Sequence, residues 1–257
     1  MNDIRDIRDT PVRTAIVTGS ASGIGAATVL ELARQGYRTV GIDLDAAGAQ
    51  TAADEAGKAN KLSHLALKAD VSDEAQVVQA FEQALAFLGQ LDVLVTSAGV
   101  AETTPFMDIS VASFRSVYEV NVIGTFLCIR EAAKRMQRGA RICTIASVAG
   151  LRGGGLSGTA AYASSKGGVL ALTKSAARSL AAQGICVNTV APGATLTPMI
   201  AEHWKNDAHR TRVESMSALN RTAQAREIAS SIVFLVSPQA SAITGSTLVA
   251  DNGLMMY

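Results

Sequence analysis

A tyrosine and a lysine four residues apart form the pair of side chains with the clearest chemical potential in this sequence. Tyr162 and Lys166 belong to a stretch that reads Tyr-Ala-Ser-Ser-Lys. On a helix, residues four apart project from the same face, about one turn from each other, so the ammonium would stand near the phenol. A nearby cation favours the phenolate and lowers a pKa that is ordinarily about 10. Such a phenol can exchange a proton with a reacting C–O group.

The spacing alone does not establish this chemistry, because Tyr-x-x-x-Lys also occurs on ordinary solvated helices. Whether Tyr162 and Lys166 exchange protons with a substrate depends on the elements that position them and on the groups that lie beside them.

The composition is that of a globular chain with one sizeable core. Its 257 residues are 48% hydrophobic and 18% charged, with a formal net charge of +1. Such a balance gives no strong field to attract nucleic acid or an anionic membrane. No apolar run reaches the roughly 18 to 20 residues of a membrane span, and the opening MNDIRDIRDT lacks the apolar core of a signal peptide. We expect a cytoplasmic protein with a flexible tail over residues 1–10 and with neither nucleic-acid nor membrane partners.

The cysteines and histidines are few and widely spaced. They are Cys128, Cys143, Cys186, His64, His203 and His209. No pair has the spacing of a metal site or a redox motif, so buried, reduced thiols and the absence of a metal are expected.

Short apolar runs alternate with segments of helical periodicity along the chain. The predicted strands are residues 14–18, 38–43, 62–69, 91–96, 140–146, 185–190 and 246–250. Between them the pattern predicts helices over 26–35, from about 46 to 57, after an N-cap at Ser72, and over 110–137, 159–183 and 224–236. Strands joined by helices imply right-handed crossovers and a parallel sheet. The fold class is therefore α/β, a single doubly wound Rossmann-fold domain over residues 11–257, with a seven-stranded, mostly parallel sheet and helices on both faces.

One segment breaks this rhythm. Residues 198–221 carry the only tryptophan, Trp204, together with two histidines and many charges. Ligands bind at the carboxyl side of a parallel sheet, so the segment is interpreted as a substrate lid near 195–220. The alternative is a solvated helical insertion without a role.

A glycine-rich turn joins the first strand to the first helix. Residues 18–25 read TGSASGIG, with glycines at 19, 23 and 25. Glycine permits a tight turn and a close backbone approach to phosphate, and the helix N-terminus offers free N–H groups. Asp43 ends the second strand, where a carboxylate can accept hydrogen bonds from an adenosine ribose. Together these features predict dinucleotide binding.

Asp43 also bears on which dinucleotide binds. Its carboxylate would repel the extra phosphate of NADP, and no arginine or lysine stands at Ser20, Ala21, Ser22, Leu44 or Asp45 to hold that phosphate. The sequence favours NAD. As an alternative Asp43 could cap the following helix, although Asp45 fits that duty better.

With these features in order, the chain resembles the short-chain dehydrogenase/reductase family along almost its whole length. The matching motifs are the TGxxxGxG turn, Asp70-Val71, Ala98-Gly99, Asn121, Ser147, Tyr162-x-x-x-Lys166, Pro192-Gly193 and Thr197. The resemblance implies an oxidoreductase that interconverts a secondary alcohol and a ketone with NAD.

It also implies the catalytic roles. Tyr162 would be the general acid in reduction and the base in oxidation. Lys166 would lower the pKa of Tyr162 and bind the nicotinamide ribose. Ser147 would hold the substrate oxygen, and Asn121 would position a water that relays the proton to solvent. The bland alternatives are that Asn121 bonds backbone at a helix kink, that Ser147 and Thr197 cap turns, and that Lys166 is solvated.

The cofactor contacts implied by the resemblance come from the ends of several strands. Besides Asp43, Tyr162 and Lys166 they are Gly19, Ser22, Gly23, Ile24, Asp70, Val71, Ala98, Gly99, Pro192, Gly193, Thr195 and Thr197. Members of the family are often homo-oligomers, so a tetramer or dimer is expected.

The sequence departs from the family in two informative places. Thr96-Ser97 replaces the usual Asn-Asn before Ala98-Gly99, which weakens side-chain support of that turn. The interval from Ser147 to Tyr162 is two residues longer than usual, and the extra length falls in the glycine-rich stretch 152–158. We expect this stretch to border the substrate, with Arg152 as the nearest candidate partner for an anion.

Two other functions stay open. One is an NADP-dependent 3-oxoacyl-thioester (acyl carrier protein) reductase, against which Asp43 argues. The other is a nucleotide-sensing protein without turnover, against which the retention of both Tyr162 and Lys166 argues.

Overall fold

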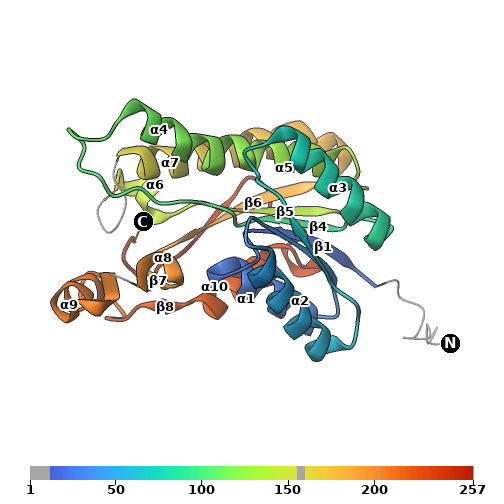
Figure 1. The fold of residues 1–257 in the computed structure, drawn as a ribbon, viewed down its shortest axis with the longest axis horizontal. Helices are drawn as coiled ribbons and strands as arrows, with labels where there is room; N and C mark the ends of the chain where they lie inside the picture. Colours follow the sequence, from blue (N-terminus) through green and yellow to red (C-terminus); the bar gives the residue numbers. More distant parts are fainter. Residues whose placement is uncertain (1–11, 155–159, 202, 257) are drawn as a thin grey trace.

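A seven-stranded parallel sheet forms the centre of the molecule (Figure 1). The computed structural model describes residues 12–154, 160–201 and 203–256, so the tail over residues 1–10 lies outside the described residues. The strand order is β3-β2-β1-β4-β5-β6-β9. The strands are β1 (Thr14–Thr18), β2 (Arg38–Asp43), β3 (Leu65–Lys68), β4 (Val93–Thr96), β5 (Arg141–Ile145), β6 (Cys186–Pro192) and β9 (Thr247–Ala250). All pairs are parallel, and the predicted doubly wound α/β fold is confirmed.

Helices cover both faces of this sheet (Figure 1). One face carries α1 (Gly23–Arg34), α2 (Ala46–Asn60) and α10 (Ala225–Leu235), and the other carries α3 (Glu74–Leu88), α4 (Val111–Tyr118), α5 (Thr125–Ala133) and α7 (Ala160–Leu180). Because successive strand residues point to opposite faces, Ile16 joins one core while Ala15 and Val17 join the other. Every residue of β1 is therefore buried, as expected for a central parallel strand. Short 3-10 helices follow α7 and α10 in the chain, namely η3 (Ala181–Gln183) and η5 (Pro238–Ala240).

The helix predicted over residues 110–137 is not continuous. A π-helical segment, η2 (Glu119–Gly124), separates α4 from α5. Two contacts hold the chain there. The side chain of Asn121 bonds both backbone groups of Val100, and a Cβ on Gly124 would lie 2.8 Å from Val71. Such insertions are often found at functional sites.

The N-cap predicted for the third helix is wrong by one residue. Asp73, not Ser72, caps α3, because its carboxylate accepts hydrogen bonds from the backbone N–H groups of Ala75 and Gln76. The Ser72 hydroxyl instead donates to Asp70 at 2.6 Å. The third and fourth strands also begin two to three residues later than predicted, at Leu65 and Val93.

Residues 195–224 leave the main body and return to it through a second, two-stranded parallel sheet. Its strands are β7 (Thr195–Leu196) and β8 (Ala223–Gln224), and α8 (Pro198–Ala201), η4 (His203–Lys205) and α9 (Asp207–Glu214) lie between them. Trp204 Nε1 donates to Thr222 Oγ1 at 3.1 Å, and that hydroxyl donates to Glu214 at 2.9 Å. The predicted lid segment is thus hydrogen-bonded to its own base.

Candidate active site

A cleft of about 400 Å³ opens at the carboxyl ends of the parallel strands. Strand order reverses between β1 and β4, which is where ligands bind in doubly wound sheets. The predicted site residues that line the cleft are Gly19, Ser22, Gly23, Ile24, Asp43, Asp70, Val71, Ala98, Gly99, Ser147, Tyr162, Lys166, Pro192, Gly193, Thr195 and Thr197. Asn121 does not line it.

The glycine-rich turn packs against the end of β4 so tightly that it excludes side chains. Gly19 has a φ of +69°, and a Cβ there would lie 2.5 Å from the backbone nitrogen of Ala98. A Cβ on Gly25 would lie 1.9 Å from the carbonyl oxygen of Gly19. Ser22, the N-cap of α1, makes no side-chain cap hydrogen bond. The first turn of α1 is thus left open toward the cleft, which fits a dinucleotide pyrophosphate.

Asp43 stands at the rim of the cleft with its carboxylate held by backbone. Its Oδ2 accepts from Ala21 N at 2.9 Å and its Oδ1 from Asp45 N at 3.0 Å. Asp45 is the N-cap of α2, as predicted, and its carboxylate accepts from the backbone N–H groups of Ala47 and Gly48. Lys68 is the register partner of Asp43 on β3 but does not line the cleft. Asp43 therefore presents a carboxylate without a cation beside it on the cleft wall.

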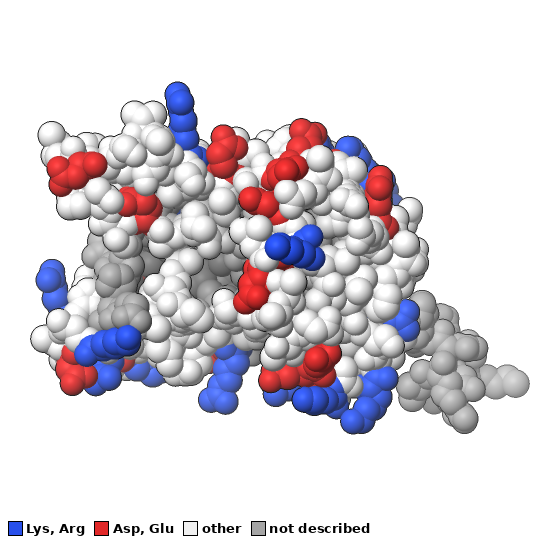
Figure 2. Space-filling model, viewed as in Figure 1, with Lys and Arg blue, Asp and Glu red and all other residues white. Residues whose placement is uncertain are grey.

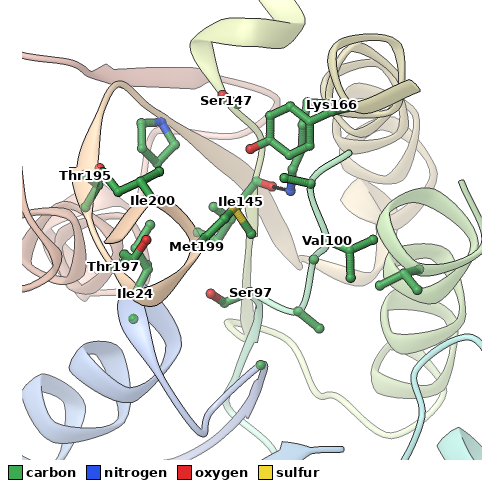
Figure 3. A pocket seen from close by; sticks show the side chains of 18 of the residues that line it. Ile24, Ser97, Val100, Ile145, Ser147, Lys166, Thr195, Thr197, Met199 and Ile200 are labelled. Carbon is green, nitrogen blue, oxygen red and sulfur yellow. Dashed lines mark hydrogen bonds between the residues drawn. The ribbon is translucent and has the colours of Figure 1, made fainter. Parts of the chain in front are cut away.

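The turn after β4 packs against side chains from η2 and α7. A Cβ on Gly99 would lie 3.2 Å from Asn121 Oδ1 and 3.3 Å from Lys166 Nζ, so glycine lets this turn touch both side chains. Ser97 lines the cleft (Figure 3). The Thr96 hydroxyl, in contrast, is buried without a hydrogen-bond partner among the described residues. The replacement of the family's two amides thus leaves one side chain at the site and one unsatisfied in the sheet.

Ser147 and Tyr162 both line the cleft. Ser147 is the N-cap of a short helix, α6 (Val148–Arg152), which the sequence did not predict, and its hydroxyl accepts from Ala149 N at 3.1 Å. Burial raises the pKa of Tyr162, and the hydrogen bond from Ser147 lowers it by less. The prediction of a lowered pKa for Tyr162 is wrong for the chain by itself, because low-dielectric surroundings disfavour the phenolate.

Lys166 is buried beside Tyr162, with only 5% of its surface exposed. Its Nζ lies 5.9 Å from the Tyr162 ring centroid and donates to the carbonyl of Ile145 at 2.8 Å (Figure 3). Burial lowers the pKa of Lys166 to about 8. The alternative of a solvated lysine is therefore wrong, and the ammonium is held at the cleft wall by one backbone acceptor.

Asn121 braces the wall from behind. Its amide donates to Val100 O at 3.0 Å and to Ser165 Oγ at 2.9 Å, while its Oδ1 accepts from Val100 N at 2.9 Å. Both donors of the side chain are thereby used inside the protein, in agreement with the alternative that Asn121 bonds backbone where its helix is distorted. The predicted water relay stays a prediction.

The loop after β6 closes the nicotinamide side predicted for the cleft. A Cβ on Gly193 would lie 2.7 Å from the Cβ of Asp251, and Thr195 Oγ1 donates to the carbonyl of Gly193 at 3.0 Å. Thr197 lies beside Gly23, where an added Cβ would be 3.2 Å from its methyl group. The first helix and the predicted lid thus meet across the cleft.

Several apolar residues also line the cleft. Met199, Ile200 and Trp204 belong to the segment predicted as a lid, whereas Ile145 and Val148 were not singled out by the sequence. In Figure 3, Met199 lies beside Ile145, and Ile200 lies on the side of Thr195. No sequence signal could separate these side chains from ordinary core residues, because only their position makes them line a cavity. The glycine-rich stretch predicted to border the substrate contributes Arg152 and Gly154, and its residues 155–159 lie outside the described part.

Charged side chains of both signs share one face of the molecule (Figure 2). Figure 2 shows acidic and basic side chains interspersed on one face, with broad areas that carry neither. Within residues 12–154, 160–201 and 203–256, no three His, Cys, Asp or Glu side chains gather to hold a metal. No helix in the same ranges has the length and apolar character needed to cross a membrane.

Comparison with known proteins places this geometry among relatives. Residues 19–255 match a family model described as enoyl-(acyl carrier protein) reductase. The chain is 39% identical over 246 residues to cis-4-hydroxycyclohexanecarboxylate dehydrogenase of Sinomonas cyclohexanicum, covering 94% of this chain and 96% of that protein. It is 35% identical over 249 residues to a 3-oxoacyl-(acyl-carrier-protein) reductase of Staphylococcus aureus, covering 95% and 98%.

Among solved structures, a short-chain dehydrogenase/reductase from Brucella melitensis, titled glucose/ribitol dehydrogenase, superposes with a TM-score of 0.89 at 32% identity. The match covers 95% of this chain and 97% of that one.

Proposed function

This chain belongs to the short-chain dehydrogenase/reductase family, and from that membership we propose that it is an NAD-dependent oxidoreductase that interconverts a secondary alcohol and a ketone. Its relatives support an oxidoreductase that acts on CH–OH groups. The choice of NAD and the roles of individual residues are our own assignment.

The observation that carries the proposal is the meeting of three side chains at one end of the cleft. Ser147, Tyr162 and Lys166 all line the cleft, and the Lys166 ammonium lies 5.9 Å from the centroid of the Tyr162 ring. A bound NAD supplies the hydride acceptor at carbon. In alcohol oxidation Tyr162 Oη takes the hydroxyl proton of the substrate, and in ketone reduction it returns that proton. Ser147 Oγ hydrogen-bonds the substrate oxygen, and the charge of Lys166 stabilises the phenolate.

Burial of Tyr162 and Lys166 predicts how the rate of reduction depends on pH. The pKa of Tyr162 is raised, so its protonated form, the acid for reduction, is present through neutral pH. The pKa of Lys166 is about 8, so the supporting positive charge is present below that pH and lost above it. Reduction should therefore have a plateau through neutral pH and decline above about pH 8.

Asp43 supports NAD over NADP. Its carboxylate is oriented by two backbone N–H groups and faces the cleft without a cation on the same wall. Such a carboxylate can accept hydrogen bonds from a ribose diol but repels a phosphate placed there.

A second candidate is the NADP-dependent reduction of 3-oxoacyl thioesters. It is favoured by the Staphylococcus aureus relative, which is 35% identical to this chain, against 39% for cis-4-hydroxycyclohexanecarboxylate dehydrogenase. Calorimetric titration with both dinucleotides separates the two candidates, because tighter binding of NADP would favour the thioester reductase.

The proposal is tested with NAD and a panel of secondary alcohols, followed through the absorbance of reduced nicotinamide. Tyr162→Phe removes the proton acceptor and should lower the rate by about 10²- to 10⁴-fold. Tyr118→Phe is the matched control, because Tyr118 stacks on Phe114 in α4, away from the cleft, and should keep the wild-type rate. Full activity in Tyr162→Phe would mean that another group moves the proton.

The family's assembly and the lid belong to this proposal as well. Val111, Ile123 and Phe126 are apolar and 40% or more exposed on α4, η2 and α5, which supports a homotetramer or dimer built on this face. Light scattering measures that state.

Trp204 lines the cleft from the predicted lid, so NAD or substrate should change its fluorescence if the segment closes. The free thiols of Cys128, Cys143 and Cys186 support a cytoplasmic protein.

A further inference from the structure

Arg152 differs from the other charged residues of the cleft. Among the described lining residues the charged ones are Asp43, Asp70, Arg152 and Lys166. Lys166 is buried and donates to Ile145, while Asp43 and Asp70 accept hydrogen bonds from neighbouring turns. Arg152 is exposed and makes no ion pair or side-chain hydrogen bond with any residue in the described ranges. Its guanidinium is thus available to a ligand.

The position of Arg152 relates it to the reacting end of the cleft. Ser147 is the N-cap of α6 and Arg152 is its last residue, so the two are separated by about 7.5 Å along the helix axis. Gly150 faces α7, because a Cβ there would lie 2.6 Å from Gly167 N. Two residues further along, about 200° around the helix, Arg152 points away from α7 and lines the cleft.

The same position separates Arg152 from the predicted adenosine end. Asp43 ends β2 and Ser147 follows β5, and β1 and β4 lie between these two strands. Three strand spacings amount to about 14 Å. Arg152 is therefore not placed to hold the extra phosphate of NADP, and a negative group that reaches it belongs to the substrate.

Apolar side chains lie at this same end of the cleft. Val148 belongs to α6 itself, and Met199, Ile200 and Trp204 come from the segment after β7. They can contact a hydrocarbon body but cannot hydrogen-bond a polar one. A single planar guanidinium matches one carboxylate through two parallel hydrogen bonds, whereas a phosphate dianion would leave charge unbalanced there.

We propose that Arg152 is a specificity-determining residue that binds the carboxylate of the substrate, and that the substrate is a hydroxy acid with an apolar segment between its carbinol carbon and its carboxylate. This inference rests on the proposed alcohol–ketone chemistry at Tyr162. The carboxylate stays unreacted, so its recognition should act mainly through KM. Acids with the hydroxyl next to the carboxylate should be poorer substrates, because about 7.5 Å of helix separates Ser147 from Arg152.

The experiment compares each hydroxy acid with its own neutral methyl ester in NAD-linked oxidation. The wild type should prefer the acid by about tenfold or more in kcat/KM, in line with a charge-assisted hydrogen bond. Arg152→Met keeps an apolar stem without the charge and should lose about tenfold on the acid, mostly in KM. Arg152→Lys should recover part of that loss. Arg178→Met removes an equivalent charge from the exposed face of α7, outside the cleft, and should behave as the wild type.

Three results would overturn the assignment. Equal losses on acid and ester in Arg152→Met would make the residue structural. Equal use of acid and ester by the wild type would remove carboxylate recognition, while leaving the alcohol chemistry intact. Preference for phosphate monoesters or acyl thioesters over hydroxy acids would assign the residue to another anion. A wild type that oxidises no alcohol at all refutes the proposed function instead, so the two failures are distinguishable.

Discussion

Cofactor choice should depend on one charge, that of Asp43. The substitution Asp43→Asn removes this charge while keeping a side-chain oxygen that can accept from Ala21 N, as Oδ2 does at 2.9 Å. The turn before α1 should therefore keep its bond to residue 43, whereas the bond from Asp45 N to Oδ1 is lost because an amide has a single oxygen. What changes is the electrostatic interaction with a phosphate on the adenosine ribose.

The size of that change follows from Coulomb's law. Two unit charges about 5 Å apart interact by about 1 kcal/mol in water and about 3 kcal/mol at the effective dielectric near a protein surface. Asp43 is partly exposed at the cleft rim, so the lower half of this range applies. Asp43→Asn should tighten NADP binding by about 5- to 30-fold. NAD should bind a few-fold more weakly, because a neutral amide is a poorer acceptor for the ribose hydroxyls.

Calorimetric titration of both dinucleotides measures these constants. The discrimination against NADP in the wild type should shrink as salt rises from about 0.1 to 1 M, because the Debye length falls from about 10 to 3 Å. Asp54→Asn removes the same charge from the exposed face of α2, outside the cleft, and is the control. An unchanged NADP affinity in Asp43→Asn, or a wild type that binds NADP more tightly than NAD, would refute the argument.

Three further predictions concern the packing that holds the site. Gly19→Ala should destabilise the fold more than Gly36→Ala and abolish NAD binding, since both glycines have positive φ but only at Gly19 would an added Cβ meet backbone, at 2.5 Å. Gly36→Ala should lower the free energy of unfolding in urea by about 1 to 2 kcal/mol. Equal losses of unfolding free energy in the two variants would contradict the tight turn. Thr96→Val should leave the free energy of unfolding unchanged or raise it, because the buried Thr96 hydroxyl has no partner among the described residues. Thr144→Val loses a 2.7 Å hydrogen bond to Thr173 and should lower the free energy of unfolding by about 1 kcal/mol. A large loss of stability in Thr96→Val would reveal a partner for its hydroxyl. Burial raises the pKa of Glu131, but hydrogen bonds from Lys134, Arg135 and Arg130 outweigh it and bring it to about 2. Because this folded-state pKa lies below the usual 4.5, the stabilisation is complete above about pH 4.5 and is lost as the pH falls toward 2. The stability difference between the wild type and Glu131→Gln, about 2 to 3 kcal/mol at neutral pH, should vanish over that window in denaturant titrations; a difference independent of pH would contradict the ion-pair account.

Local patterns in the chain were sufficient for the fold and for most of the site. Alternating apolar runs and helical periodicity predicted each strand of the parallel sheet, because burial on both faces requires such runs. The glycines of the first turn and Asp43 could be assigned before the structure, since the strand–turn–helix order determines where they meet a ligand. Tyr162 and Lys166 needed only helical spacing to be placed together.

Elements that depend on contacts distant in sequence were missed. The short helix α6 has five residues, too few for periodicity, and the β7–β8 pair has two residues in each strand. The π-helical segment forms where Asn121 reaches the loop at Val100, 21 residues away. No local signal in residues 110–137 records these partners, so a continuous helix was the natural expectation.

The order and type of the reactive groups were therefore determined by the sequence, and their electrostatic state by the tertiary structure. Charge spacing along one helix predicted a lowered pKa for Tyr162, but burial in the folded chain raises it and lowers that of Lys166 to about 8. The physical reason is that spacing along a helix is a local property, whereas desolvation depends on everything packed around a group. Arg152 could be named from the sequence as a candidate partner for an anion, but its place on the cleft wall depends on how α6 packs on α7.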